Sequence, residues 1–271
     1  MRKLCAAALL CISSASTADV KLYVFDCGRI SFDDVSMFSL SNEETDVRQL
    51  FVPCYLIEHD AGRLLWDAGL PLDIVGQGKV EVRPGAAMWY DASLLDQMAA
   101  MGLAPSDVDF AAFSHMHYDH VGAANAFKGS TILIQASEYV AAFERADDNA
   151  FFNQTLYADL NDAERVILNG DHDVFGDGSV EIISAPGHTP GHQTLLLELD
   201  NFGPLMLSGD LYHFEASRAM RRVPEFNTDA AETLRSMDKV EAIVAATRAT
   251  FWIEHNQALA DTLKMAPAYY D

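Results

Sequence analysis

The chain has 271 residues, half of them hydrophobic, which is enough for one large domain or two small ones with a sizeable buried core. It carries 18 lysine and arginine residues against 40 aspartate and glutamate residues, for a net charge of -22. This excess of negative charge argues against binding to nucleic acid or to an anionic membrane surface, and it is otherwise typical of a well-solvated surface.

The first eighteen residues have the layout of a cleavable secretory signal. A basic start precedes an apolar run over residues 4–12, and small residues lead up to Ala18. The apolar run is too short to cross a membrane as a helix. We therefore expect a signal peptide at 1–18 and a mature domain at 19–271, located in the periplasm or secreted.

Two of the four cysteines, Cys5 and Cys11, lie within the predicted signal. Cys27 and Cys54 remain, both in segments with the composition of strands. In an oxidising compartment these two residues can pair. Two buried free thiols fit the sequence as well, so both alternatives stay open.

Hydrophobic periodicity predicts the elements of the first half of the mature chain. A helix is expected at 91–101, ended by Gly102, and strands at 20–25, 53–58, 63–66 and 109–114. The second and third of these strands would form a hairpin with a glycine in its turn. Residues 29–50 are polar and irregular, which predicts a long loop.

In the second half, short helices are expected at 122–127 and 137–145, the latter capped by Ser137, and a longer helix from the cap Thr228 to about residue 246. Residues 146–162 are irregular. Further strands are expected at 131–135, 180–184, 193–199, 204–207 and 250–253, with a last helix after His255. Strands with helices interspersed predict a mixed α/β domain built in layers.

The stretch from His115 to His120 holds three imidazoles and a carboxylate, and it follows the strand-like run at 110–113. In an extended or turning backbone, His115 and His117 point the same way, so they can bind one metal ion. Asp119 and His120, just past the turn, can face a second ion beside it. Imidazole with carboxylate suits zinc and similar metals. The alternative is a surface histidine cluster that binds nothing.

Three further residues have the position of metal ligands after predicted strands. His188 lies with His192 in a loop rich in glycine and proline, Asp210 follows the strand at 204–207, and His255 follows the last strand. Taken singly, each has an ordinary explanation as a turn, cap or surface residue. Their position at strand ends favours a site shared with the first motif.

Together these residues resemble the ligand set of the metallo-β-lactamase superfamily, and more narrowly that of its N-acyl-homoserine lactonases. The match consists of the pattern His-x-His-x-Asp-His at 115–120, followed by His188, Asp210 and His255. Residues 65–71 are also similar to an early segment of that family. The resemblance covers most of the mature chain.

The resemblance implies a single-domain αββα four-layer sandwich that holds two divalent metal ions, with Zn²⁺ as the expected metal. Asp210 would bridge the two ions. The other implied ligands are His115, His117 and His188 for the first ion, and Asp119, His120 and His255 for the second. Asp67 would orient a ligand imidazole, although a plain turn residue fits as well, and His192 is not expected to be a ligand.

The activity implied by the resemblance is opening of the lactone ring of N-acyl-homoserine lactones, which degrades a quorum signal. A hydroxide shared by the two ions would attack the lactone carbonyl, and Asp119 would relay a proton to the departing ring oxygen. Lactonases of this type carry a tyrosine three residues after the bridging aspartate, where this chain has His213, preceded by Tyr212. We expect His213 to face the substrate. The alternative is that His213 and Tyr212 both have structural roles.

Three other functions are compatible with the sequence. The histidine at position 213 also resembles secreted phosphotriesterases of the methyl parathion hydrolase type, in which the same hydroxide would attack phosphorus. A glyoxalase-II-like thioesterase is disfavoured because the chain has an export signal and no basic cluster suited to glutathione. A non-enzymatic metal-binding or scaffold protein would have to keep the full ligand set without turnover.

An acyl chain needs an apolar wall beside the metal site. Seven residues lie in segments that would reach it, although each is more typical of ordinary core: Met37, Phe38, Met88, Trp89, Phe151, Phe152 and Phe214. His59 and His172 lie in polar, turn-like stretches and are expected on the surface. The expected partner is a small acyl lactone or related ester, with no nucleic acid and no membrane span, and a homodimer stays open.

Overall fold

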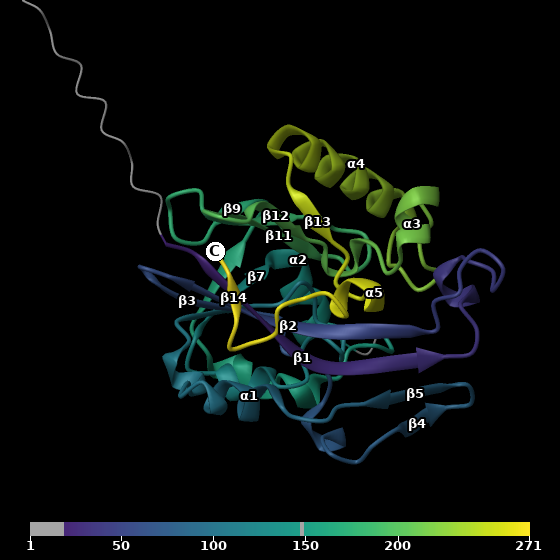
Figure 1. Cartoon of the computed structure of the whole chain (residues 1–271), viewed down its shortest axis with the longest axis horizontal. Coiled ribbons are helices and arrows are strands. Elements are labelled where there is room, and N and C mark those ends of the chain that lie inside the picture. Colours follow the sequence, from purple (N-terminus) through teal and green to yellow (C-terminus); the bar gives the residue numbers. More distant parts are fainter. Residues whose placement is uncertain (1–18, 147–148) are drawn as a thin grey trace, which may run out of the picture.

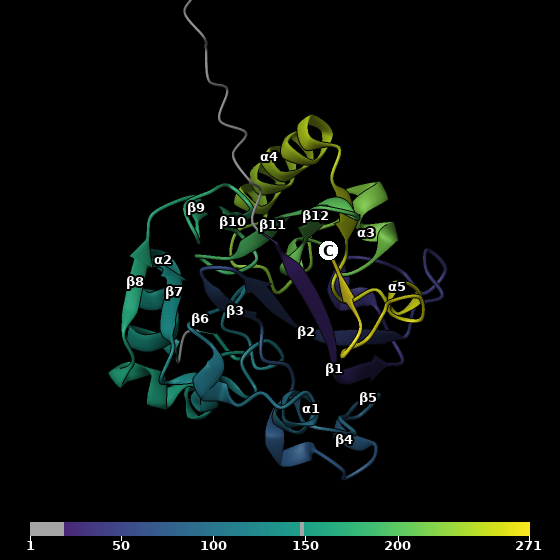
Figure 2. The same ribbon diagram turned by 60° about the vertical axis from the view of Figure 1, so that its left-hand side comes forward.

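The computed structural model describes residues 19–146 and 149–271, so the signal predicted at 1–18 lies outside the described residues. Within them, two β-sheets stack on each other (Figures 1 and 2). The larger sheet has nine strands. Eight of them follow the order β4 (Val80–Arg83), β5 (Ala86–Trp89), β1 (Lys21–Phe32), β2 (Gln49–His59), β3 (Gly62–Trp66), β6 (Phe110–Ala112), β7 (Thr131–Gln135) and β8 (Arg165–Leu168). The ninth strand, β14 (Tyr269–Tyr270), pairs with β1. The smaller sheet has five strands in the order β13 (Thr250–Trp252), β12 (Gly203–Leu207), β11 (Gln193–Leu199), β10 (Val180–Ser184) and β9 (His172–Asp173).

Helices cover the outer faces of both sheets. α4 (Ala230–Thr247) lies over the smaller sheet with α3 (Glu215–Met220) beside it, and α1 (Leu94–Ala100) lies on the opposite side of the molecule (Figure 1). Two shorter helices are α2 (Ala136–Tyr139) and α5 (Gln257–Ala260). The order helix, sheet, sheet, helix confirms the predicted four-layer α/β sandwich. In the described ranges, no helix combines the length and apolar character needed to cross a membrane.

Three clusters of buried side chains fill the three spaces between the four layers. Successive side chains of a strand point to opposite faces, so β11 serves two clusters: Leu195 and Leu197 pack between the sheets, and Leu196 packs under α4. The same alternation places Leu65 of β3 with Leu94 of α1 in the third cluster. Continuous apolar runs of this kind are typical of strands that are covered on both faces.

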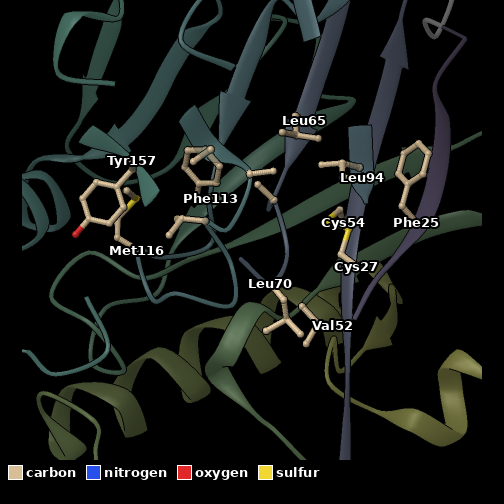
Figure 3. Close-up of a cluster of buried hydrophobic side chains, with 14 of the residues drawn as sticks. Phe25, Cys27, Val52, Cys54, Leu65, Leu70, Leu94, Phe113, Met116 and Tyr157 are labelled. Carbon is tan, nitrogen blue, oxygen red and sulfur yellow. A yellow bond between two sulfur atoms is a disulfide. The ribbon is translucent and has the colours of Figure 1, made fainter. Parts of the chain in front are cut away.

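Cys27 of β1 and Cys54 of β2 form a disulfide with their Cα atoms 5.8 Å apart, which decides between the two alternatives that the sequence left open. The bond is buried in the cluster that includes α1 (Figure 3). Gly69 packs directly against it, and a Cβ on this glycine would lie 2.3 Å from the Cβ of Cys27. The chain can therefore approach the disulfide here only with glycine.

The loop predicted at 29–50 was partly wrong, because β1 continues to Phe32. Residues 29–32 pair with β2 on one side and with β5 on the other, and a bulge between Asp26 and Arg29 lets the strand bend between these partners. The hairpin of β4 and β5 was not predicted. β4 has only four residues and is largely exposed, so its alternation of valine with charged residues was too short to predict a strand. The strands β8, β9 and β14 and the helix α3 were also missed.

Two predicted helix caps differ from the structure. The Ser137 hydroxyl does not cap a helix but donates to the Pro190 carbonyl at 2.7 Å. α4 is capped by the side chain of Asp229 and not by Thr228. The cap of α4 was misplaced by one residue between two suitable polar side chains. α2 begins two residues earlier than predicted, after Gln135, whose side chain makes no capping hydrogen bond.

His59 was expected on the surface but is buried. Its ring stacks on Phe175 with the centroids 4.1 Å apart, and its Nε2 lies 3.1 Å from Asp177 Oδ2. These contacts join the turn between β2 and β3 to the segment before β10. His172, in β9, is half-buried.

Candidate metal centre

The residues predicted as metal ligands converge at one end of the sandwich. β6 ends shortly before the 115–120 motif, β10 before the His188 loop, β12 before Asp210 and β13 before His255. Gly209 adopts a φ of 50°, a left-handed conformation that turns the chain sharply just before Asp210. Side chains at strand ends are well placed for chemistry because a rigid sheet holds them.

Three imidazoles and one carboxylate form the first group. His115 Nε2 lies 2.9 Å from His117 Nδ1, and His188 Nε2 lies 3.1 Å from each of these nitrogens. Asp210 Oδ2 is 3.3 Å from His188 Nε2. Four ligands arranged as a tetrahedron around a zinc ion would be about 3.3 Å apart, so the first group has nearly the spacing that zinc requires.

The second group contains Asp119, His120 and His255. Asp210 Oδ1 lies 3.3 Å from His120 Nε2 and 2.9 Å from His255 Nε2, while Asp119 Oδ2 is 3.9 Å from each of these nitrogens. Asp210 therefore presents one oxygen to the first group and the other to the second. This is the arrangement expected of a carboxylate placed between two cations.

Unpartnered buried atoms test whether these residues suit metal ions. His120 Nε2, His255 Nε2 and Asp210 Oδ1 are buried and have no hydrogen-bond partner within the described part of the chain. Such atoms cost free energy unless another group satisfies them. All three atoms face the second group, where coordination to a divalent cation would satisfy them. In the first group, the fit to a metal ion rests on the spacing of the ligand atoms.

The two groups differ in their protonation. Burial lowers the pKa of His115 and of His117 well below the usual value, so both are neutral, the form in which imidazole binds a metal. Burial also opposes protonation of His255, but the Asp210 carboxylate outweighs this effect and raises the pKa of His255 to about 9. A cation that enters the second group must therefore displace a proton.

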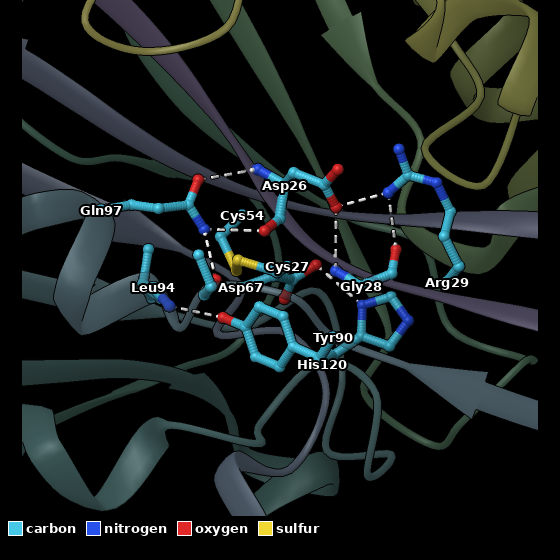
Figure 4. The surroundings of a disulfide bond; sticks show 11 residues. Asp26, Cys27, Gly28, Arg29, Cys54, Asp67, Tyr90, Leu94, Gln97 and His120 are labelled. Carbon is cyan, nitrogen blue, oxygen red and sulfur yellow. Dashed lines mark hydrogen bonds and ion pairs between the residues drawn. A yellow bond between two sulfur atoms is a disulfide. The ribbon is translucent and has the colours of Figure 1, made fainter. Parts of the chain in front are cut away.

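Each histidine of the two groups has its second ring nitrogen held by a neighbour, as is usual for metal-ligating histidines. Asp67 accepts from His120 Nδ1 at 2.8 Å, and from the N–H and hydroxyl of Ser114 at 2.6 and 2.9 Å. It lies with His120 in the surroundings of the disulfide (Figure 4). His255 Nδ1 donates to the Phe51 carbonyl at 2.7 Å. Asp67 thus orients a histidine and is more than a turn residue.

His192 lies outside both groups. Its Nδ1 donates to the Ala185 carbonyl at 3.0 Å, and its Nε2 accepts the N–H of Asp210 at 2.9 Å. Both ring nitrogens are occupied, so this histidine supports the backbone of Asp210.

The two candidates that follow Asp210 point in opposite directions. His213 lines a cavity, with its Nε2 3.0 Å from Asp210 Oδ2. Tyr212 is buried in the cluster under α4, and its hydroxyl donates to Glu241 at 3.2 Å. The extended backbone at this position sends successive side chains to opposite faces, so Tyr212, the second catalytic candidate beside His213, lies away from the cavity. A catalytic role for either residue stays a prediction.

The cavity beside the two groups has a volume of about 370 Å³ and includes Asp119 and Asp210 in its wall. Three of the predicted apolar residues line it: Met37, Phe38 and Phe151. Arg83, Tyr118 and Phe226 also line it and were not predicted. The position of Tyr118 inside the metal motif was a usable signal. Nothing in the sequence connects the other two to the motif.

The other four apolar candidates lie elsewhere. Phe214 packs behind Phe38 with the ring centroids 4.8 Å apart. Phe152 lines a neighbouring cavity of about 820 Å³. Among the described residues that line the two cavities, neither Met88 nor Trp89 of β5 is found. Met88 is buried in the cluster that includes α1, and Trp89 is half-buried on the opposite face of the strand.

The layers and the converging side chains define an αββα protein with histidine–aspartate groups suited to metal ions. The sequence model of the metallo-beta-lactamase superfamily matches residues 47–250. The chain belongs to this superfamily, as its ligand pattern predicted.

Known proteins similar to the chain include N-acyl homoserine lactonases. AttM of Azorhizobium caulinodans, an N-acyl homoserine lactonase, is 28% identical over 270 residues, which cover 93% of this chain and 99% of that protein. A solved N-acyl homoserine lactone hydrolase, with the product N-hexanoyl-L-homoserine bound at its catalytic metal center, has a TM-score of 0.79 at 26% identity and covers 94% of this chain and 100% of its own. A Bacillus thuringiensis AiiA mutant with N-decanoyl-L-homoserine bound at the active site has the same TM-score, identity and coverage.

Proposed function

We propose that this chain is a metal-dependent hydrolase that opens the lactone ring of N-acyl homoserine lactones. The observation that carries the proposal is the placement of Asp210, which presents one carboxylate oxygen to each histidine group at the wall of a partly apolar cavity. The named activity of the similar proteins supports it. The proposed metals are two divalent cations, with zinc as the expected one because of the imidazole and carboxylate donors.

When bound, such ions would supply Lewis acidity and a nucleophile derived from water at neutral pH. The chain itself supplies positioning and proton transfer. Asp119, a member of the second group, lies in the cavity wall, where its carboxylate would relay a proton to the departing ring oxygen. His213 faces the same cavity, where its ring would hydrogen-bond the substrate carbonyl. Phe38 and Phe151 would pack against the acyl chain and exclude water from it.

The test is hydrolysis of a homoserine lactone series beside a phosphotriester by metal-loaded protein, with Asp210→Asn as the control. We expect fast lactone opening that the substitution abolishes, because asparagine removes the negative charge between the two groups. Fast phosphotriester cleavage with slow lactone opening would instead support the phosphotriesterase alternative, which depends on His213 in the cavity. Hydrolysis of neither substrate by metal-loaded protein would refute the proposal.

We also propose that the protein is exported. The signal predicted at 1–18 is the basis of this proposal, and the buried Cys27–Cys54 disulfide supports it, since such bonds persist in oxidising compartments. Intact-mass measurement of the exported protein should give a chain that begins at Asp19. A chain that retains Met1 would contradict the proposal.

A further inference from the structure

Glu138 is a buried carboxylate that joins the two loops carrying the histidines of the first group. It lies in α2 with 2% of its surface exposed. Its Oε1 accepts the N–H of Met116 at 2.9 Å, and its Oε2 accepts the N–H of Gly191 at 2.8 Å. Each oxygen thus holds the backbone of a different loop.

Both loops lead directly to the first metal group. Met116 stands between His115 and His117, so its N–H fixes the backbone from which both rings project. Gly191 follows His188 by three residues and precedes His192, whose Nε2 accepts the N–H of Asp210. The backbone held by Glu138 therefore leads to every member of the first group.

The docking of the second loop on α2 is unusually close. A Cβ on Gly191 would lie 2.5 Å from the Cβ and the backbone nitrogen of Glu138, so only glycine allows this approach. The Ser137 hydroxyl donates to the Pro190 carbonyl from the same turn of the helix. The first turn of α2 is thus shaped to hold this loop at a fixed distance from the metal motif.

The second group depends on other anchors. His120 is held by Asp67, and His255 by the Phe51 carbonyl. Within the described part of the chain, no hydrogen bond joins either anchor to Glu138. A change at Glu138 should therefore affect the two groups differently.

We propose that Glu138 is a positioning residue that sets the separation of the two histidine loops and thereby the affinity of the first group for its metal ion, with a smaller effect on the second group, which it reaches only through Asp210. The inference rests on the proposed function only in assuming that both groups bind metal. Its test measures metal affinity and does not require hydrolysis of any substrate.

The main variant is Glu138→Gln, which keeps the size of the side chain. The amide offers one accepting oxygen, and its NH₂ group must face the other backbone N–H, so one of the two loops loses its anchor. The zinc affinity of each group is measured separately in two backgrounds: His255→Ala, which keeps the first group intact, and His188→Ala, which keeps the second.

We expect Glu138→Gln to weaken zinc binding about 10- to 100-fold in the His255→Ala background, the usual effect of losing a partner that orients a metal ligand. The same substitution should change the zinc affinity by less than about threefold in the His188→Ala background, where only the second group is intact. Asp67→Asn is the matched control and should weaken zinc binding more in the His188→Ala background than in the His255→Ala background, because Asp67 bonds His120 directly and reaches His115 only through Ser114. Gly191→Ala should reproduce the Glu138→Gln pattern by displacing the same loop.

An equal loss in both backgrounds would show that Glu138 acts on general stability and would overturn the inference, as would unchanged affinity in the first. If Glu138→Gln does not fold, Gly191→Ala decides by the same criterion. Lactone opening by wild-type protein with unchanged zinc binding in Glu138→Gln would refute this inference alone. Wild-type protein that binds no zinc would refute both the inference and the proposed function.

Discussion

Removal of the Cys27–Cys54 disulfide should destabilise the protein substantially without changing its fold. The bond closes a loop with a sequence separation of 27 residues. The chain-entropy relation for such a loop gives about 3.5 kcal/mol at 25 °C. That is a large part of the roughly 5–15 kcal/mol by which a typical domain is stable. The double variant Cys27→Ala/Cys54→Ala is the appropriate perturbation, since alanine adds no polar atom to this buried cluster.

Urea unfolding at equilibrium measures the effect. We expect the midpoint to fall by the equivalent of about 3.5 kcal/mol. In a strong reductant, the unfolding midpoint of wild-type protein should fall toward that of the variant, whereas the midpoint of the variant should not change. An unchanged midpoint, or two free thiols in unreduced wild-type protein, would refute the reasoning.

Three further predictions follow from the site and its surroundings. Phe38→Ala should lower kcat/KM for decanoyl lactone on the order of tenfold more than for butanoyl lactone, because Phe38 lines the cavity, while Trp89→Ala should affect both alike. Because the pKa of His255 is raised from 6.5 to about 9, its proton stabilises the metal-free fold fully below pH 6.5 and no longer above about pH 9. The zinc affinity of the second group should therefore rise over this range, and calorimetry in buffers of different ionisation enthalpy should detect the released proton. Zinc binding that does not depend on pH would contradict this prediction. Trp66→Phe should lower the free energy of unfolding, measured in urea, by about 1–3 kcal/mol, because the buried Glu254 loses the indole N–H that its Oε1 accepts at 3.1 Å. An equal loss in Trp252→Phe would show that lost packing, and not the lost hydrogen bond, causes the effect.

The sequence predicted a layered α/β domain because its strands are strongly apolar and helices lie between them, and the family resemblance implied the four-layer arrangement. The strands at 131–135, 180–184 and 193–199 have the predicted limits because both of their faces are buried. Prediction failed where a strand is short and exposed, as in β4, or where pairing and not composition extends it, as at the end of β1. Such strands depend on their neighbours in space.

The candidate site was predictable for a different reason. The 115–120 motif is local, so a two-residue period sufficed to infer that His115 and His117 act together. Asp210 and His255 are distant in sequence and could be joined to the motif only through the family resemblance. The structure brings these residues together, and their binding of metal remains a prediction.

Glu138 and the disulfide show what local sequence could not reveal. A glutamate near the start of a helix is usually exposed, and no pattern indicates that its two oxygens hold two distant loops. Two cysteines in apolar strands fit free thiols as well as a bond, until the spatial register of β1 and β2 is known.

The most direct test of the proposed two-metal lactonase is a zinc titration of metal-free protein during hydrolysis of N-hexanoyl homoserine lactone. Lactone opening should be absent without zinc and should reach its plateau at two equivalents, because the two histidine groups share Asp210 and each fits one ion. Full activity without metal, a plateau at one equivalent, or no lactone opening with two zinc ions bound would contradict the proposal.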